Sequence, residues 1–139
     1  MFIGEYHHNI DSKGRIAVPV KFRGELGNTV VINRSLDHCL AIYSLESWQK
    51  EYETLMSLNQ NKADVRKYVR AMTSQAFECP FDVQGRIIIP PVLMKMASLD
   101  KECVFTGCGD KVELWSNDGW TNYNAGLTDD EIIEISENL

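Results

Sequence analysis

The sequence predicts an α+β protein, mainly β, made of two tandem, pseudo-symmetric halves with linking helices. The first observation is that the stretch Asp11 to Arg15, DSKGR, returns 71 positions later as Asp82 to Arg86, DVQGR. The second is that the match continues downstream at a separation of 72, where Trp48 aligns with Trp120. The third is size, because 139 residues with 44% hydrophobic content suit two small halves that share a core.

Each copy of the repeat contains a predicted turn followed by an exposed arginine. In the pattern Asp-x-x-Gly-Arg, the Asp side chain can accept hydrogen bonds from backbone groups ahead of it, and the Gly can adopt the positive φ of a tight reversal. β-Branched and aromatic residues on both sides favour strands. The sequence therefore predicts two hairpin tips, flanked by strands at Tyr6 to Ile10, Arg15 to Val18, Phe77 to Phe81 and Arg86 to Ile89.

A proline follows the second strand of each half. Pro19 and Pro90 lack a backbone N–H, so each ends a strand and is well placed to open a helix. We expect short helices at Val20 to Leu26 and Pro91 to Ala97. Two further strands follow in each half, at Asn28 to Arg34, Cys39 to Tyr43, Cys103 to Thr106 and Lys111 to Trp115.

Helical periodicity begins at Leu45, between the halves. Trp48, Tyr52 and Leu55 recur at i, i+4 and i+7, which predicts an amphipathic helix. Asn61 is expected to cap a second helix. Its buried face is predicted at Val65, Tyr68 or Val69, and Met72.

The last part of the sequence predicts a further amphipathic helix. Thr128 to Glu131 fits a capping box, and the helix behind it carries Ile132, Ile133 and Ile135. These isoleucines need a surface to cover, on this chain or on a neighbour. The elements predict a first repeat with its trailing helix at 1–58, a linking helix at 59–74, and a second repeat with the C-terminal helix at 75–139.

Charge is distributed unevenly along the chain, whose formal net charge is −6. Residues 1 to 34 carry five basic and three acidic side chains, or +2, and residues 35 to 139 carry nine and seventeen, or −8. An acidic protein can bind DNA through a locally positive face. The basic residues gather around the first tip, so we expect Arg15→Ala to weaken specific binding more than Arg86→Ala.

The linking helix and the C-terminal helix carry opposite charge. Four basic residues of the linking helix face one acidic residue, Asp64, and form either a solvated face or a phosphate-binding one. The C-terminal acidic residues have no basic neighbour and are consistent with a solvated helix face. The basic residues are Lys62, Arg66, Lys67 and Arg70, and the acidic ones are Asp129, Asp130, Glu131, Glu134 and Glu137.

The sequence lacks the signatures of several other classes of protein. Its four cysteines have no Cys-x-x-Cys spacing, which argues against zinc motifs and favours free, mostly buried thiols. His38 precedes Cys39, but adjacent residues of a strand point to opposite faces, so the pair does not predict a thiol nucleophile. We expect no enzyme activity, no metal and no cofactor. Neither a signal peptide nor a membrane span is apparent, so we expect a soluble, cytoplasmic protein.

Short motifs frame the two tips. In the first half they are Phe2 to Tyr6, Ile10 to Arg15, Val18-Pro19, Lys21 to Arg23, Leu36-Asp37, Leu40, Tyr43, Leu45-Glu46 and Trp48. In the second half they are Cys79, Asp82, Gln84 to Arg86, Ile89-Pro90, Trp115 and Trp120. With these motifs the sequence resembles the MraZ proteins of bacteria over nearly its full length.

This resemblance implies two swapped-hairpin, AbrB-like β-barrel halves of the SpoVT-AbrB type, related by pseudo-two-fold symmetry. It also implies a homo-oligomeric ring, octameric or dodecameric, that binds double-stranded DNA at the nucleoid. The implied function is transcription regulation. The protein would act as a repressor of its own cluster of cell-division and cell-wall genes through short direct repeats in the promoter.

The resemblance carries the family's tip residues over to the arginines Arg15 and Arg86 and the aspartates Asp11 and Asp82. An arginine can donate two hydrogen bonds to guanine, and nearby basic residues are expected to hold phosphates. Gln84 stands where the first tip has Lys13, so the second tip carries one less positive charge. The complete predicted DNA-binding set is Arg15, Arg86, Lys13, Asp11, Gly14, Asp82, Gln84, Gly85, Lys21 and Arg23.

Two other interpretations stay open. An Asp and an Arg four residues apart can form a simple surface ion pair, with the Gly there for the turn. The whole chain can also be read as an oligomeric module that binds a protein partner and no nucleic acid, which the acidic C-terminal segment favours.

Overall fold

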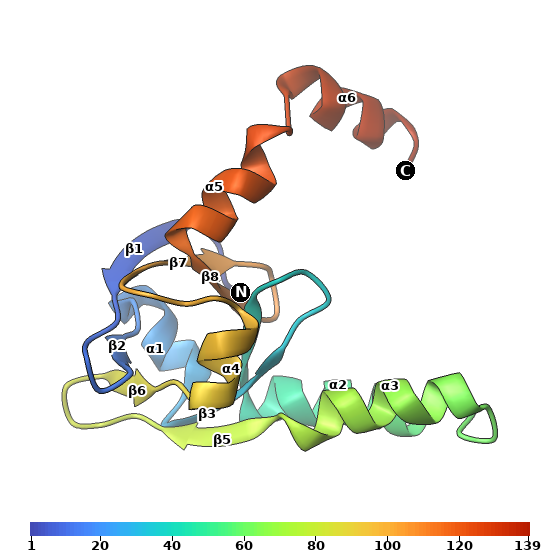
Figure 1. Cartoon of the computed structure of the whole chain (residues 1–139), viewed down its shortest axis with the longest axis horizontal. Helices are drawn as coiled ribbons and strands as arrows, with labels where there is room; N and C mark the ends of the chain where they lie inside the picture. The colour runs from blue at the N-terminus through green and yellow to red at the C-terminus, as the bar shows by residue number, and fades with distance from the viewer.

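The computed structural model describes residues 1–139 and contains two antiparallel β-sheets and six helices (Figure 1), which confirms the predicted α+β class. The larger sheet has the strand order β1-β7-β8-β4-β3-β5, and the smaller sheet pairs β2 with β6. The strands are β1 Glu5–Asn9, β2 Arg15–Ala17, β3 Thr29–Arg34, β4 Leu40–Ser44, β5 Phe77–Pro80, β6 Arg86–Ile88, β7 Glu102–Gly107 and β8 Val112–Ser116. The helices are α1 Val20–Leu26, α2 Leu45–Met56, α3 Ala63–Ser74, α4 Pro91–Met96, α5 Asn117–Ala125 and α6 Asp129–Glu137.

The strand order of the larger sheet is consistent with a pseudo-two-fold symmetry that relates the two halves. In the repeat, β1 corresponds to β5, β3 to β7 and β4 to β8, so the order of the larger sheet reads the same from either edge. β4 and β8 meet at its centre, with Ala41 opposite Glu113. β2 and β6 pair with Ile16 opposite Ile87. Both are pairs of equivalent positions, so the pseudo-two-fold axis passes between them.

The strands on either side of each tip do not pair with each other, so the predicted hairpin pairing is wrong. β1 of the first half lies on β7 of the second, and β5 of the second half lies on β3 of the first. The exchange leaves β2 and β6 to pair with each other, and their side chains Ile16 and Ile87 are each 1% exposed. Burial of these two side chains in a common core favours the long-range pairing.

One core serves both halves, as the sequence predicts. A single cluster of 20 buried side chains includes Phe22 and Ile32 from the first half and Leu93 and Phe105 from the second. α1 and α4 begin directly after prolines with φ of −51° and −56°. α1 has the predicted bounds, and α4 ends at Met96, one residue early.

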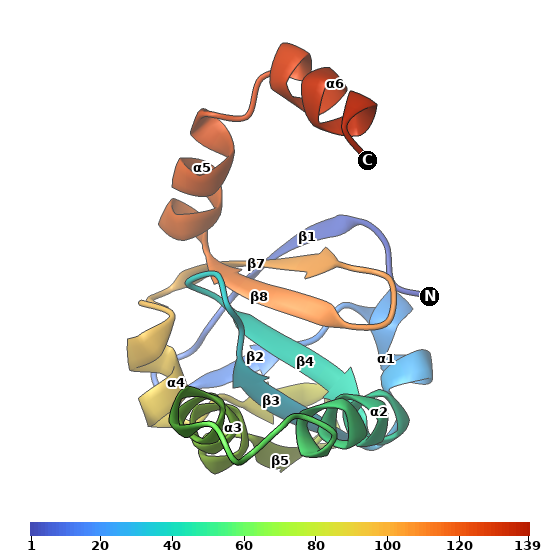
Figure 2. The same ribbon diagram turned by 90° about the vertical axis from the view of Figure 1, so that its right-hand side faces the viewer.

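Two helical segments project from the body (Figures 1 and 2). We call residues 45–74, with α2 and α3, the helical arm, and residues 117–137, with α5 and α6, the C-terminal arm. The first helix of each arm begins after a serine, Ser44 or Ser116, whose side chain accepts a hydrogen bond from a backbone N–H three residues on. The sequence prediction missed α5, although Ser44 and Ser116 are equivalent positions of the repeat. No helix is both long and apolar enough to span a membrane.

The helical arm differs from its prediction in two details. The N-cap of α3 is Lys62 rather than Asn61, and no side chain caps this helix. The Asn61 backbone N–H instead donates to Oδ1 of Asn59 in the preceding turn. Of the two alternatives for the inner face, Val69 is the buried residue and Tyr68 is 37% exposed. In the C-terminal arm, Thr128 accepts from the backbone N–H of Glu131, as predicted.

Candidate nucleic-acid interface

The first tip is held together by the side chain of Asp11. Its Oδ1 accepts hydrogen bonds from the backbone N–H groups of Lys13 and Arg15, both at 2.9 Å. Its Oδ2 accepts from Nε of Arg15 at 2.7 Å. The N–H of Gly14 donates to the Asp11 carbonyl oxygen at 3.0 Å, and Gly14 has a φ of +78°. The predicted turn, with Asp as acceptor and Gly at positive φ, is confirmed.

The second tip repeats this geometry. Oδ1 of Asp82 accepts from the backbone N–H groups of Gln84 and Arg86 at 2.9 Å, and Oδ2 accepts from Nε of Arg86 at 2.7 Å. Gly85 donates to the Asp82 carbonyl oxygen at 3.0 Å and has a φ of +74°. The chain therefore builds the same guanidinium site twice.

Both tip arginines are oriented yet keep free donors. The Asp holds only Nε of each guanidinium, and the terminal nitrogens of Arg15 and Arg86 make no hydrogen bond within the chain. The two side chains are 32% and 30% exposed. A guanidinium has five N–H donors, so four remain for a ligand. The ion pair and a binding role are therefore compatible, because the carboxylate fixes the plane of the group that would bind.

The two tips are bonded to each other's halves. The N–H of Val18 donates to the carbonyl oxygen of Gly85 at 3.1 Å, and the N–H of Ile89 donates to that of Gly14 at 2.9 Å. In Figure 1 the loops that lead into β2 and β6 lie at the same side of the molecule, and the helical arm extends to the opposite side. The structure thus brings the two tips together and places the basic residues of α3 away from them.

Arg23 lies at the second tip, which corrects the placement of charge predicted from the sequence. It is on α1 of the first half, and its Nε donates to the Val18 carbonyl oxygen at 2.7 Å. Its guanidinium lies against Gly85, because a Cβ added to that glycine would collide with Cζ and Nη1 of Arg23. The equivalent residue of the second half is Met94, whose Sδ would lie 3.6 Å from a Cβ on Gly14. Because the strands exchange, each helix flanks the other half's tip.

The contact of Arg23 with Gly85 gives the second tip the positive charge that its own loop sequence lacks. Gln84 replaces Lys13 in the loop, but Arg23 adds a guanidinium close to Arg86. Lys13 is exposed in the first loop, and Lys21 is exposed on α1. In the sequence, this asymmetry is visible as Arg23 in the first half and Met94 at the equivalent position of the second half. The difference can be assigned to the second tip only when the strand exchange is known.

Alanine at the two tip glycines is expected to separate turn strain from loss of this contact. Gly14→Ala and Gly85→Ala each place a Cβ at positive φ, which costs about 1–2 kcal/mol of stability. Only Gly85→Ala also displaces Arg23. We therefore expect both variants to lose stability in urea unfolding, Gly85→Ala more than Gly14→Ala because Arg23 is also moved from its hydrogen bond to Val18. We also expect a larger loss of DNA affinity for Gly85→Ala. Equal affinities of the two variants would show that Arg23 takes no part in binding.

The tip carboxylates are expected to titrate below the ordinary range. Hydrogen bonds from the backbone N–H and the guanidinium of Arg15 hold the pKa of Asp11 below its ordinary value of 3.8, and Arg86 does the same for Asp82. Because the folded pKa is lowered, the stabilising contribution is complete above pH 3.8 and is lost as the pH falls through the folded pKa. NMR titration of the carboxyl carbons should give midpoints below 3.8 in the folded protein and near 3.8 in urea. Equal midpoints in the two states would contradict the turn geometry.

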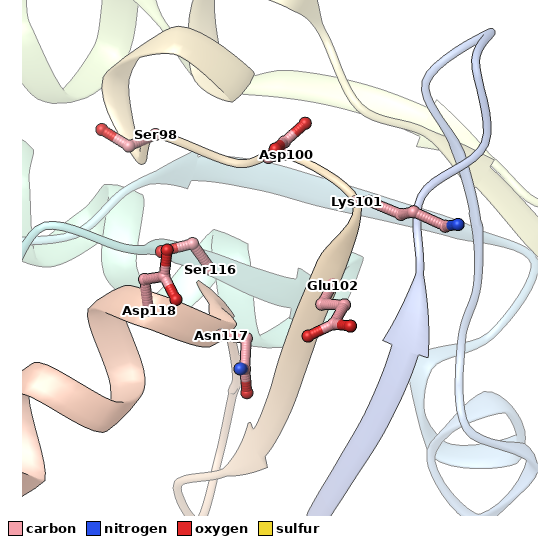
Figure 3. Close-up of a pocket in the computed structure, with 7 residues that line it drawn as sticks. All are labelled: Ser98, Asp100, Lys101, Glu102, Ser116, Asn117 and Asp118. Atoms are coloured by element: carbon pink, nitrogen blue, oxygen red, sulfur yellow. The ribbon is translucent and has the colours of Figure 1, made fainter.

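A polar hollow lies between the turn before β7 and the start of α5 (Figure 3). Its serines are engaged, since Ser116 Oγ accepts from the Gly119 N–H at 2.9 Å and Ser98 Oγ lies 2.9 Å from Nε2 of His38. No group of three His, Cys, Asp or Glu side chains in the chain is arranged to hold a metal ion. The hollow is lined by Ser98, Asp100, Lys101, Glu102, Ser116, Asn117 and Asp118.

The thiols are unsuited to nucleophilic catalysis. Three cysteines are buried, Cys108 is exposed, and all four are free, as predicted. Burial raises the pKa of Cys39 to about 12 and that of Cys103 to about 11, so both stay protonated at neutral pH. Cys39 Sγ lies 2.9 Å from Ser35 Oγ, whereas its neighbour His38 contacts Ser98. No thiol–imidazole pair is formed there.

Comparison with known proteins gives matches over the whole chain. The family model described as "MraZ protein, putative antitoxin-like" matches residues 1–71 and again residues 72–139. The chain is 47% identical over 141 residues to "Transcriptional regulator MraZ" of Halothermothrix orenii, covering 100% of this chain and 99% of that protein. It is 43% identical over 139 residues to the protein of the same name from Thermoanaerobacter pseudethanolicus, covering 100% and 96%.

Proposed function

This chain belongs to the MraZ family, and from that premise we propose that it is a DNA-binding transcriptional regulator that reads promoter DNA through its two tips. The relatives are named as transcriptional regulators, a non-enzymatic function. The observation that carries the proposal is the duplicated guanidinium site. Two arginines stand on one side of the molecule, each fixed through Nε and each with its terminal donors free.

The chemistry of recognition follows from the donors that remain. In the major groove, the O6 and N7 atoms of guanine accept two hydrogen bonds from one guanidinium, which contributes about 1–3 kcal/mol of discrimination per pair. Asp11 and Asp82 limit rotation of the arginines, so less side-chain entropy is lost on binding. Gly14 and Gly85 keep the loops narrow, and Gln84 offers an amide to a base or phosphate.

Affinity would come mainly from the phosphate backbone. Lys13 is exposed in the first tip, Lys21 is exposed on α1, and Arg23 of the same helix lies at the second tip. Such contacts position a protein without reading sequence, and they weaken as salt rises. The acidic C-terminal arm projects away from the sheet (Figure 2), so its charge need not oppose DNA at the tips.

Finer features of the proposal concern assembly and regulation. We interpret the exchange of β1 and β5 as the swapped-hairpin arrangement of AbrB-like barrel halves, with repeats at 1–58 and 75–139 joined by the linking helix at 59–74. A homo-oligomeric ring would present many tips at fixed spacing, so short direct repeats in a promoter could engage several at once and gain avidity. We propose that the protein represses its own cluster of division and cell-wall genes in this way.

The test is a salt titration of binding to a duplex from upstream of the protein's own gene, beside a scrambled duplex. We expect preference for the first duplex and an affinity that falls with salt, with a slope of about −0.9 per neutralised phosphate. Arg15→Ala should reduce the preference, and Lys50→Ala, a charge-matched control on α2, should keep it in full. Weak, equal binding of both duplexes by all three proteins would favour the protein-interaction module instead.

A further inference from the structure

The two tips share one backbone geometry but differ at an exposed side chain. The backbone N–H of Lys13 in the first tip and that of Gln84 in the second each donate to Oδ1 of the tip aspartate at 2.9 Å. The two positions are therefore equivalent. Both side chains are exposed, and neither makes a hydrogen bond within the chain. One tip consequently offers an ammonium group and the other a neutral amide at the same place.

A hollow lies beside each tip, against the helix that flanks it. The hollow at the second tip is lined by Arg23, which donates through Nε to the Val18 carbonyl oxygen and whose terminal nitrogens make no hydrogen bond within the chain. The hollow at the first tip is lined by Met94 at the equivalent position, and by Asp100 and Lys101, whose charges cancel. Only the second hollow therefore offers a guanidinium to a phosphate group.

The charge of Arg23 leaves Gln84 available to read a base. A phosphate oxygen of DNA only accepts hydrogen bonds, so it would use the Nε2 donor of Gln84 and leave the Oε1 acceptor unused. Adenine presents a donor at N6 and an acceptor at N7 in the major groove, and one glutamine side chain pairs with both. The Cα atoms of Gln84 and Arg86 are at most about 7 Å apart and successive base pairs about 3.4 Å, so the two side chains can reach adjacent base pairs.

We propose that Gln84 is a specificity-determining residue, which reads an adenine next to the guanine bound by Arg86, while Arg23 binds a phosphate beside the same tip. This rests on the proposed function and deepens it. The first tip then reads guanine alone, because Lys13 binds phosphate there. The tips lie at the same side of the molecule (Figure 1), and identical tips related by the pseudo-two-fold axis would bind a site equally well in two orientations. The difference between the tips therefore gives the protein a direction on DNA.

Selection of binding sites from randomised duplexes by the full-length protein tests the role of Gln84. The unaltered protein should select an adenine beside one of its two guanines, with a preference of at least about fivefold over the other bases. Gln84→Ala should remove that preference and keep both guanines. Gln84→Glu should replace the adenine by cytosine, whose N4 donates to a carboxylate. Val83→Ala, a control at the exposed neighbouring position of the same loop, should select the unaltered site.

The outcomes separate this proposal from the proposed function on which it rests. A selected site without the adenine, or a site that Gln84→Ala leaves unchanged, overturns the role of Gln84 and leaves recognition by the arginines standing. An unaltered protein that selects no sequence at all overturns the proposed function itself.

Directed cleavage of end-labelled DNA tests the direction of binding. An iron chelate is attached through Ser12→Cys at the first tip or Val83→Cys at the second, in a chain with Cys108→Ser, because the other three cysteines are buried. On a duplex with one selected site, the two labels should cut at opposite ends of the site. With Gln84→Ala added, each label should cut at both ends, and with Lys13→Gln added as well, the two ends should exchange. Cutting at both ends by the chain that keeps Gln84, or a pattern that these substitutions leave unchanged, overturns the proposal.

Discussion

Replacing both tip arginines, Arg15→Ala together with Arg86→Ala, is expected to abolish the preference for the upstream duplex over the scrambled one. Each arginine offers two free terminal nitrogens to a base edge, so each loss should cost about 1–3 kcal/mol of discrimination and the pair about twice that. Non-specific, salt-dependent binding through Lys13 and Lys21 should remain. Competition anisotropy at fixed salt measures both quantities.

The single variants test whether the loss of DNA affinity follows the charge counted along the sequence or the charge that surrounds each tip in the structure. The sequence favours a larger loss for Arg15→Ala, but Arg23 lies against Gly85 and supplies the second tip with charge. We therefore expect similar losses for Arg15→Ala and Arg86→Ala. Arg23→Ala should weaken binding to both duplexes and reduce the slope of log affinity against log salt concentration by about one. A loss confined to Arg15→Ala would restore the interpretation based on sequence order.

Truncation of the paired isoleucines at the pseudo-two-fold axis, Ile16→Ala or Ile87→Ala, is expected to reduce the free energy of unfolding by about 2–5 kcal/mol. The two side chains face each other across β2 and β6 and are each 1% exposed. Their positions are equivalent, so the two losses should be similar. Urea unfolding measures them, and all variants are compared at one fixed protein concentration, because any association between chains would add to the apparent stability.

The control for this loss is Ile88→Ala on the same strand. Ile88 is 60% exposed, so its truncation leaves no cavity and should change stability by less than about 0.5 kcal/mol. The double variant of Ile16 and Ile87 should lose less than the sum of the two single losses, because the residues are opposite each other. Independent, additive losses would contradict the shared core at the axis.

The local structure was predictable from the sequence because local chemistry determines it. Asp11 and Gly14 specify the turn by hydrogen bonding and positive φ, and both residues behave as predicted at the first tip. Pro19 fixes the start of α1, whose bounds are those predicted. The serine that begins α5 repeats Ser44, so this helix was readable from the repeat and was overlooked.

The pairing of strands was not predictable from local signals. β2 has only three residues, and nothing in its composition distinguishes pairing with β1 from pairing with β6. The choice depends on the common burial of Ile16 and Ile87, which are 71 positions apart in the sequence. The same exchange carries Arg23 to the second tip, so charge counted along the chain assigned it to the first tip.

The exchange of strands also sets the order in which the molecule can be completed during translation. β1 is synthesised first, but Glu5 pairs with Thr106, about 100 residues later. At about 5–20 residues per second, the first strand waits roughly 5–20 s for its partner. A chain that stops after α3 has neither β7 nor β6, so β1 and β2 are left with open edges that favour association with other chains. The end of the molecule that carries the two tips therefore matures late, although the first of its two loops is among the earliest residues made.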